Sequence, residues 1–219
     1  MGIKVIFLCA GYGTRLERDL LNSKEHKDLF GEYDSCLSVL NDGTTCNEDR
    51  LGAVASINFA IEEFKLENDD VLIIGGDTLF YNDFDMEKFV SKFNDLKSNT
   101  KNCGLVTTYT CKEDETTKYG ILEVDQNGKV KSLIEKPQPC ETKSRLACPC
   151  FYLLSSDCSS FIKQFLDERK HSPLKEKDAT GHLIKYLIAK CNIHSYQISG
   201  RFDVGGLQSY IECNDYFCK

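Results

Sequence analysis

A glycine-containing segment near the N-terminus has the residue types of a phosphate-binding loop. It follows an apolar run at residues 3–8 and reads Leu8-Cys9-Ala10-Gly11-Tyr12-Gly13-Thr14-Arg15-Leu16. Glycine permits unusual backbone dihedral angles and removes the Cβ atom, so backbone N–H groups can close on an anion. The guanidinium of Arg15 adds a bidentate clamp for phosphate. A plain strand-to-helix turn is the alternative interpretation, because two glycines at this spacing are common.

Two aspartates follow apolar stretches elsewhere in the chain. Asp77 ends the sequence Gly75-Gly76-Asp77 after residues 71–74, and Asp203 comes shortly after residues 193–198. Ligands of an α/β sheet bind beyond the carboxyl ends of its strands, so we expect Asp77 beside the glycine loop. For either aspartate alone, a solvated turn residue is the alternative.

A phosphate loop and two carboxylates together are the components of a metal–nucleotide site. Mg²⁺ prefers one or two carboxylates together with phosphate oxygens and water. Phosphoryl and nucleotidyl transfer depend on positioning and charge neutralisation more than on covalent chemistry. The sequence therefore predicts Mg²⁺ as a cofactor, bound by Asp77 and Asp203.

An α/β chain is expected to position these groups, because apolar strand-like runs alternate with amphipathic helical patterns. Helices are predicted at residues 49–64, 84–96, 156–169 (capped by Ser or Asp) and 181–190, with a short one at the C-terminus. Strands are predicted at residues 3–8, 36–40, 71–74, 104–109, 146–154 and 193–198. Residues 121–124 and 130–134 flank Asn127-Gly128, a pair that favours a primed hairpin turn.

Composition narrows the class of partner. The 219 residues suit one domain, and the net charge of −7 argues against a nucleic acid or an anionic membrane as the main partner. No stretch approaches the ~20 apolar residues of a membrane span, and the N-terminus lacks a signal-peptide pattern. The 12 scattered cysteines favour reduced thiols and a cytoplasmic location. Cys148-Pro149-Cys150 has the wrong spacing for a zinc knuckle.

The chain resembles the sugar nucleotidyltransferases, a family that includes glucose-1-phosphate thymidylyl-, mannose-1-phosphate guanylyl- and phosphocholine cytidylyltransferases. The resemblance rests on motifs that occur in family order over almost the whole chain. Besides residues 8–16, these are Arg50-Leu51-Gly52-Ala53, Gly75-Gly76-Asp77, Tyr119-Gly120-Ile121-Leu122, Glu135-Lys136-Pro137 and Phe202-Asp203-Val204-Gly205. It implies a Rossmann-like mixed sheet flanked by helices, with a β-hairpin insertion.

The resemblance also implies a role for each matching residue. The nucleotide would be bound by Ala10, Gly11, Gly13, Thr14, Arg15 and Gly52. Arg15, Asp77 and Asp203 would be catalytic, the two aspartates through Mg²⁺. Gly120, Glu135 and Lys136 would line the sugar side, although Glu135-Lys136 could equally be an ordinary charged strand end. The substrates would be a nucleoside triphosphate and a sugar-1-phosphate, pyrophosphate would be released, and a homo-oligomer is compatible with the family.

Two departures from the family pattern lie between the glycine loop and residue 43. The family has a Pro-Lys-x-Leu element after the loop, and the nearest match here is His26-Lys27-Asp28-Leu29, which makes Lys27 the candidate phosphate-binding lysine. Only residues 29–40 then stand where the family has a helix, a strand and another helix. A parallel crossover alone needs about a dozen residues, so this unit cannot be complete. We therefore expect a single domain, residues 1–219, with an internal deletion around 29–40.

Two functions are consistent with this sequence. The first is an Mg²⁺-dependent nucleotidyltransferase that acts on a sugar-1-phosphate or a similar small phosphate. The second is a catalytically impaired family member that retains the fold and acts as a binding or regulatory subunit. The short segment at residues 29–40 is the feature that favours the second function.

Overall fold

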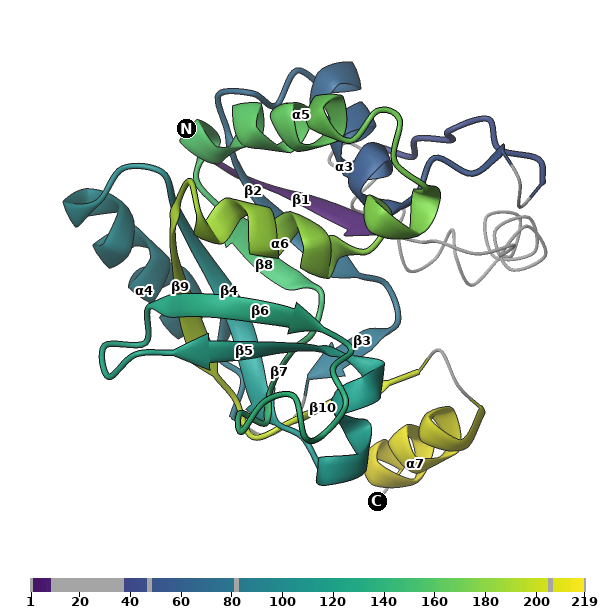
Figure 1. The fold of residues 1–219 in the computed structure, drawn as a ribbon, viewed down its shortest axis with the longest axis vertical. Helices are drawn as coiled ribbons and strands as arrows, with labels where there is room; N and C mark the ends of the chain where they lie inside the picture. The colour runs from purple at the N-terminus through teal and green to yellow at the C-terminus, as the bar shows by residue number, and fades with distance from the viewer. Residues whose placement is uncertain (1, 9–37, 47–48, 81–82, 205–206, 219) are drawn as a thin grey trace.

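Apolar strands alternate with amphipathic helices to build a layered α/β fold in the computed structural model of this protein (Figure 1). The structure describes residues 2–8, 38–46, 49–80, 83–204 and 207–218. The main sheet has eight strands of mixed direction, as predicted from the family resemblance. Its order is β1-β2-β8-β4-β7-β5-β6, and β9 pairs with β4 beside this path.

The sheet contains both parallel and antiparallel pairs. β1 (Ile3–Leu8) pairs in parallel with β2 (Asp70–Gly75), and β4 (Cys103–Thr110) pairs in parallel with β9 (Asn192–Gln197). β8 (Phe151–Leu154) lies antiparallel between β2 and β4. The hairpin strands β5 (Gly120–Val124) and β6 (Val130–Glu135) extend the sheet through β7 (Leu146–Cys148). The predicted strands at residues 3–8, 71–74, 104–109 and 193–198 are therefore confirmed.

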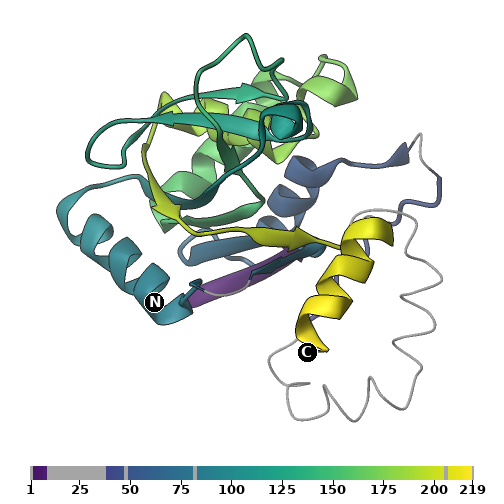
Figure 2. The ribbon, with the colours of Figure 1, turned by 90° about the horizontal axis from the view of Figure 1, so that it is seen from below.

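The central strands are apolar on both faces because each face is covered by helices. Val71 and Ile73 of β2 face a core built with α3 (Ala53–Glu63), α5 (Ser159–Glu168) and α6 (Thr180–Ile188). Leu72 and Ile74 face the opposite core, which α4 (Met86–Asn99) covers with Phe89 and Phe93. Figure 2 shows α4 on one side of the sheet and α3, α5 and α6 on the other.

Two predicted helices begin later than their apolar periodicity indicates. The helix expected at residues 49–64 begins at Ala53, because Gly52 has a φ of +89° and cannot belong to a right-handed helix. The helix expected at 156–169 begins at Ser159, after the 3₁₀ turn η3 (Ser156–Cys158). Its predicted Ser or Asp cap is wrong, since no side chain caps either element.

Two strand predictions are also corrected. Residues 146–154 form two strands, because Pro149 has no backbone N–H to donate within a ladder and Cys150 turns the chain between them. The carbonyl of Cys150 accepts instead from the N–H of Gly75 at 2.7 Å. The part of the 36–40 strand that the structure describes, residues 38–40, is not a strand. Residues 36 and 37 lie outside the described ranges.

The hairpin is confirmed, but its turn is not the predicted primed type. The N–H of Gly128 donates to the carbonyl of Asp125 at 3.0 Å, so Gln126 and Asn127 are the central residues. Only Gly128 has a positive φ, +77°, whereas a type I′ turn at Asn127-Gly128 would need positive φ at both. The loop therefore combines a standard turn with a glycine bulge, and the side chain of Asp125 accepts from the N–H groups of Asn127 and Lys129.

A strand from the middle of the chain and a strand near its C-terminus build a second, two-stranded sheet that the sequence did not predict. β3 (Thr78–Phe80) pairs antiparallel with β10 (Arg201–Asp203), and we call this pair the ribbon. The predicted C-terminal helix, α7 (Leu207–Phe217), follows it and packs against β10 (Figure 2). In the described part of the chain, no helix is both long and apolar enough to pass through a membrane.

Candidate functional site

The ribbon brings Asp77 and Asp203 together from distant parts of the sequence. Asp203 is opposite Thr78 in the register of β10 and β3, and the N–H of Val204 donates to the carbonyl of Asp77 at 2.8 Å. Just before Asp77, the N–H of Gly76 donates to the carbonyl of Leu8 at 3.0 Å. The two aspartates thus lie at the carboxyl ends of β1 and β2, the edge at which α/β sheets bind their ligands.

A buried arginine that the sequence analysis did not select lies beside Asp203. The side chain of Arg201 is only 7% exposed, and its Nη2 donates to Oδ2 of Asp203 at 2.9 Å. Nη1 donates to Oγ1 of Thr78 at 3.0 Å, and the guanidinium carbon lies 5.2 Å from the ring centre of Tyr119. The only sequence signal for this arrangement is the i, i+2 spacing of Arg201 and Asp203, which puts both side chains on one face of a strand.

The carboxylate of Glu135 is enclosed by glycines on two elements. Gly120 is opposite Glu135 in the register of β5 and β6, and a Cβ atom at residue 120 would lie 3.1 Å from Oε2 of Glu135. Gly181, in the first turn of α6, is closer still, since its Cβ would lie 1.9 Å from the same oxygen. The structure therefore brings Gly120 and Glu135 together as predicted, and it adds Gly181, which the sequence analysis treated only as part of a helix.

Lys136, the residue after Glu135, has a strained backbone. It is linked through Tyr119 to Arg201. Its φ is +51°, a conformation that a residue with a side chain adopts at a cost of about 1–3 kcal/mol. The N–H of Lys136 donates at 3.0 Å to the carbonyl of Tyr119, the residue whose ring lies next to Arg201. Such strain is common at functional sites, where surrounding contacts hold it in place.

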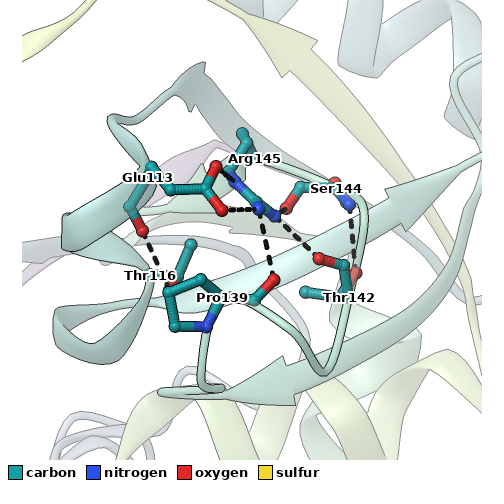
Figure 3. A network of polar contacts seen from close by, with 6 residues as sticks. All are labelled: Glu113, Thr116, Pro139, Thr142, Ser144 and Arg145. Carbon is teal, nitrogen blue, oxygen red and sulfur yellow. Dashed lines mark hydrogen bonds and ion pairs between the residues drawn. The ribbon is translucent and has the colours of Figure 1, made fainter.

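The segment that follows Lys136 is anchored by a second arginine (Figure 3). Arg145 donates to both carboxylate oxygens of Glu113, from Nε at 2.7 Å and from Nη2 at 2.5 Å. The same guanidinium also donates to the carbonyls of Thr142, Ser144 and Pro139. This network connects the 3₁₀ helix η2 (Glu113–Lys118) to the chain between β6 and β7, so the loop after Glu135-Lys136 has a defined course.

Gly52 lies at the start of α3, where it contacts the chain that leads into α6. Oδ1 of Asp178 accepts from the N–H of Ala53 at 2.7 Å, and a Cβ atom at residue 52 would lie 2.8 Å from that oxygen. Arg50 forms an ion pair with the other oxygen of Asp178 at 3.1 Å. Asp178 therefore satisfies the backbone N–H of Ala53, which has no acceptor within α3 because it lies in the first turn. No motif in the sequence marked Asp178 as a partner of residue 52.

The described site residues face one end of the sheet. Figure 1 shows the arrowheads of β1 and β6 and the beginning of α6 on the same side of the molecule, with the ribbon below them. The hydroxyl of Tyr152 in the central strand β8 lies 3.1 Å from Oγ1 of Thr180, the first residue of α6. The remaining predicted site residues, Ala10, Gly11, Gly13, Thr14, Arg15 and Lys27, lie outside the described ranges.

The carboxylates of Asp77 and Asp203 are the kind of donor that Mg²⁺ prefers. Two carboxylates carried by adjacent backbone segments, with Arg201 beside them, leave the remaining ligands to phosphate oxygens and water, which is the coordination that Mg²⁺ favours. Within the described ranges, no cluster of three or more His, Cys, Asp or Glu side chains could hold a metal ion on its own.

Cys148 and Cys150 are close to this site but are not suited to metal binding or nucleophilic chemistry. Burial raises the pKa of Cys150 to about 12, and the charge of Asp77 acts in the same direction. Burial likewise raises the pKa of the Cys148 thiol. Both side chains therefore stay neutral thiols at pH 7, and every described cysteine is free.

Comparison with known proteins identifies several curated nucleotidyltransferases as relatives. A protein 32% identical over 126 residues is a UTP–glucose-1-phosphate uridylyltransferase of Pseudomonas aeruginosa; the match covers 53% of this chain and 43% of that one. A glucose-1-phosphate adenylyltransferase of Pseudothermotoga lettingae is 28% identical over 151 residues, which are 67% of this chain and 33% of the relative. The chain thus spans half or less of the length of these curated relatives.

A solved structure shares the fold over nearly the whole chain. The crystal structure of a UDP-glucose pyrophosphorylase complexed with UDP-glucose superposes with a TM-score of 0.72 at 18% identity, and covers 99% of this chain and 81% of the other. The predicted fold, a mixed sheet flanked by helices of the nucleotide-diphospho-sugar transferase type, is therefore confirmed.

The family assignment rests on a match along most of the sequence. The family model described as nucleotidyl transferase matches residues 18–219, a range that includes the ribbon and the wall formed by Gly120, Glu135 and Lys136. The order of motifs, the fold and the relatives all agree with this match. The chain therefore belongs to the nucleotidyl transferase family.

Proposed function

We propose that this protein transfers a nucleoside monophosphate from a nucleoside triphosphate to a sugar-1-phosphate in an Mg²⁺-dependent reaction that releases pyrophosphate. The observation that carries the proposal is the ribbon, which brings Asp203 and the segment of Asp77 side by side at the carboxyl end of β2 in a member of this family. The activities of the relatives make UTP or ATP with glucose-1-phosphate the first substrates to test.

In the proposed reaction, an oxygen of the sugar phosphate attacks the α-phosphorus in line, and the bond to the β-phosphate breaks. Asp77 and Asp203 would hold Mg²⁺, which when bound orients the two anions and offsets their repulsion. Glu135 would accept hydrogen bonds from sugar hydroxyls, and the ammonium group of Lys136 would neutralise the sugar phosphate. Gly52 would let the base or ribose approach the backbone at the start of α3.

The proposal assigns the phosphates of the nucleotide to residues that the structure does not describe. Ala10, Gly11, Gly13 and Thr14 would supply backbone donors, and Arg15, with Lys27, would supply positive charge. We further propose a single domain, residues 1–219, with a shortened segment around 29–40. Free thiols at the described cysteines support the proposed cytoplasmic location.

A pyrophosphate-release assay tests the proposal. The four common ribonucleoside triphosphates and dTTP would each be combined with glucose-1-phosphate, mannose-1-phosphate and phosphocholine, with Mg²⁺ or with EDTA. We expect turnover with at least one pair, no turnover in EDTA, and a loss of about 100-fold or more in kcat for Asp77→Asn and Asp203→Asn. Asp95→Asn, at an exposed position on α4, is the matched control and should keep full activity.

The competing function is a binding or regulatory subunit without turnover. The observation that favours it is the short segment at residues 29–40, where the family has a helix, a strand and another helix. Nucleotide binding measured by calorimetry, with no turnover for any substrate pair, would favour this function and contradict the enzymatic proposal. Size-exclusion chromatography with light scattering would show whether the chain forms the homo-oligomer that the sequence analysis allowed.

A further inference from the structure

We propose that Arg201 is a positioning residue that fixes Asp203 for the metal-assisted step and couples it to the sugar-side wall through Tyr119. The inference rests on the proposed function, because it assigns to Arg201 a role in that same site. Its basis is the contacts of the buried Arg201 guanidinium with Thr78, Asp203 and the ring of Tyr119.

The hydrogen bonding of Arg201 is incomplete for a buried cation. Nη1 and Nη2 bond Thr78 and Asp203, but Nε is buried and has no acceptor among the described residues. A buried donor without a partner is costly and rare in folded proteins. The bonds that Arg201 does make join Thr78 of β3 to Asp203 of β10, so the guanidinium holds these two side chains together.

Arg145, in the same chain, has the hydrogen bonding expected of an arginine that stabilises the fold. All three of its guanidinium nitrogens donate, to the carboxylate of Glu113 and to three backbone carbonyls (Figure 3). Its side chain is also more exposed than that of Arg201, 20% against 7%. Arg145 therefore gains more hydrogen bonds at a lower desolvation cost, and it contacts none of the proposed site residues.

The shape of the guanidinium matters as much as its charge. Arg201 must reach Oγ1 of Thr78 on β3 and Oδ2 of Asp203 on its own strand, and its plane must also lie near the ring of Tyr119. A planar fork can satisfy these three partners together, whereas the ammonium group of lysine is a compact point charge. Arginine at this position thus holds Asp203 in one orientation relative to the Asp77 segment.

Tyr119 links Arg201 to Lys136, on the side of the site that we propose to bind the sugar phosphate. Its ring packs at 6.0 Å, edge to face, against that of Tyr109, which is buried at the end of β4. Its carbonyl accepts the N–H of Lys136, the strained residue next to Glu135. A sugar phosphate that binds Lys136 would therefore act on the same rigid group that orients Asp203.

The experiment compares Arg201→Lys and Arg201→Met with the matched controls Arg145→Lys and Arg145→Met. Binding of Mn²⁺, as a spectroscopic substitute for Mg²⁺, would be measured by electron paramagnetic resonance with the αβ-methylene analogue of the preferred triphosphate. Loss of a group that orients a metal ligand typically costs 10- to 100-fold in metal affinity. We expect a weakening of that size in both Arg201 variants, with a parallel fall in kcat and little change in KM for the triphosphate.

The Arg145 variants should change the unfolding midpoint in urea and leave Mn²⁺ affinity within about twofold of the wild type. Should Arg201→Met fail to fold, Arg201→Lys and Tyr119→Leu test the same connection, and both should weaken Mn²⁺ binding in the same direction. Arg201 variants that fold and bind Mn²⁺ as the wild type does would overturn this inference alone. A wild-type protein that binds no Mn²⁺ with any triphosphate analogue would overturn the proposed function as well.

Discussion

The carboxylate of Asp178 accepts a hydrogen bond from the backbone N–H of Ala53 at 2.7 Å, although the two residues belong to segments far apart in the sequence. The contact ties the N-terminus of α3 to the chain that enters α6. It requires glycine at residue 52, because the same Asp178 oxygen lies 2.8 Å from the place of a Cβ atom there. Gly52, which we propose to lie near the base, and the start of α6 are therefore positioned together.

This contact predicts a large cost for Gly52→Ala. Alanine would be strained at a φ of +89° and would also collide with Asp178, so we expect a loss of roughly 2–4 kcal/mol in the free energy of unfolding. Gly43→Ala is the matched control, since Gly43 has a φ of +76° and nothing within 4 Å, and it should cost only about 1 kcal/mol. Urea unfolding measures both. A Gly52→Ala/Asp178→Ala double variant should recover part of the loss, and equal costs for the two glycines would refute the collision.

Gly181→Ala should damage substrate binding more than stability. A Cβ atom at residue 181 would lie 1.9 Å from Oε2 of Glu135, and a flexible carboxylate can move away from it. Alanine also favours a helix over glycine by about 1 kcal/mol, which offsets the disturbance. We expect an unchanged melting temperature within a few degrees and a KM for the sugar phosphate raised about tenfold.

Glu135→Ala provides the control for this prediction. If Gly181→Ala acts by displacing Glu135, the double variant should be no worse than Glu135→Ala alone. Additive effects on KM would show that residue 181 affects the site by another route. The KM for the triphosphate should stay unchanged in all three variants.

Lys136→Gly should make the protein more stable and less active. Glycine adopts a φ of +51° without strain, so we expect a gain of about 1 kcal/mol in the free energy of unfolding and a fall in kcat/KM. Lys65→Gly is the matched control, because Lys65 has a φ of +55°, is exposed and follows the last turn of α3. It should give a similar gain with unchanged kcat/KM. A stabilised, fully active Lys136→Gly variant would remove the side chain of Lys136 from the proposed mechanism.

The hydrogen bonds between Asp83 and Ser199, just before the ribbon, should make the stability of the protein depend on pH in the acid range. The carboxylate of Asp83 accepts from the backbone N–H and the hydroxyl of Ser199, two residues before β10, and these bonds lower the pKa of Asp83 below its ordinary value of 3.8. A depressed pKa adds stability that is complete above the unfolded value and lost as the pH falls through the folded value. We expect Asp83→Asn to be less stable than the wild type at pH 7, with a difference that shrinks below pH 3.8.

Urea unfolding between pH 3 and pH 7 would check this dependence. Ser199→Ala, which removes the hydroxyl but keeps the backbone donor, should show part of the same effect. A stability difference between the wild type and Asp83→Asn that does not change with pH would show that the carboxylate acts only through neutral hydrogen bonding.

Local chemistry was sufficient to predict most of the elements and their order. The apolar runs at 71–74 and 104–109 specify strands buried on both faces, and the 3.6-residue spacing of Val54, Ile57 and Ile61 specifies the buried side of α3. The order of motifs also indicated the family and selected Asp77 and Asp203, whose backbone segments the ribbon brings side by side. These properties depend on neighbouring residues, whose periodicity is visible in a single sequence.

The tertiary structure decided where separate segments approach one another. The burial of Arg201 beside Asp203, the fit of Glu135 against Gly181 and the contact of Asp178 with Gly52 each join residues from different elements. No local pattern encodes them, because the space available to a side chain depends on how whole helices and strands pack. The sequence by itself thus predicted the residues that we propose to bind a metal and a nucleotide. Only packing decided which of them are held rigidly against each other, since that depends on contacts between segments that are distant along the chain.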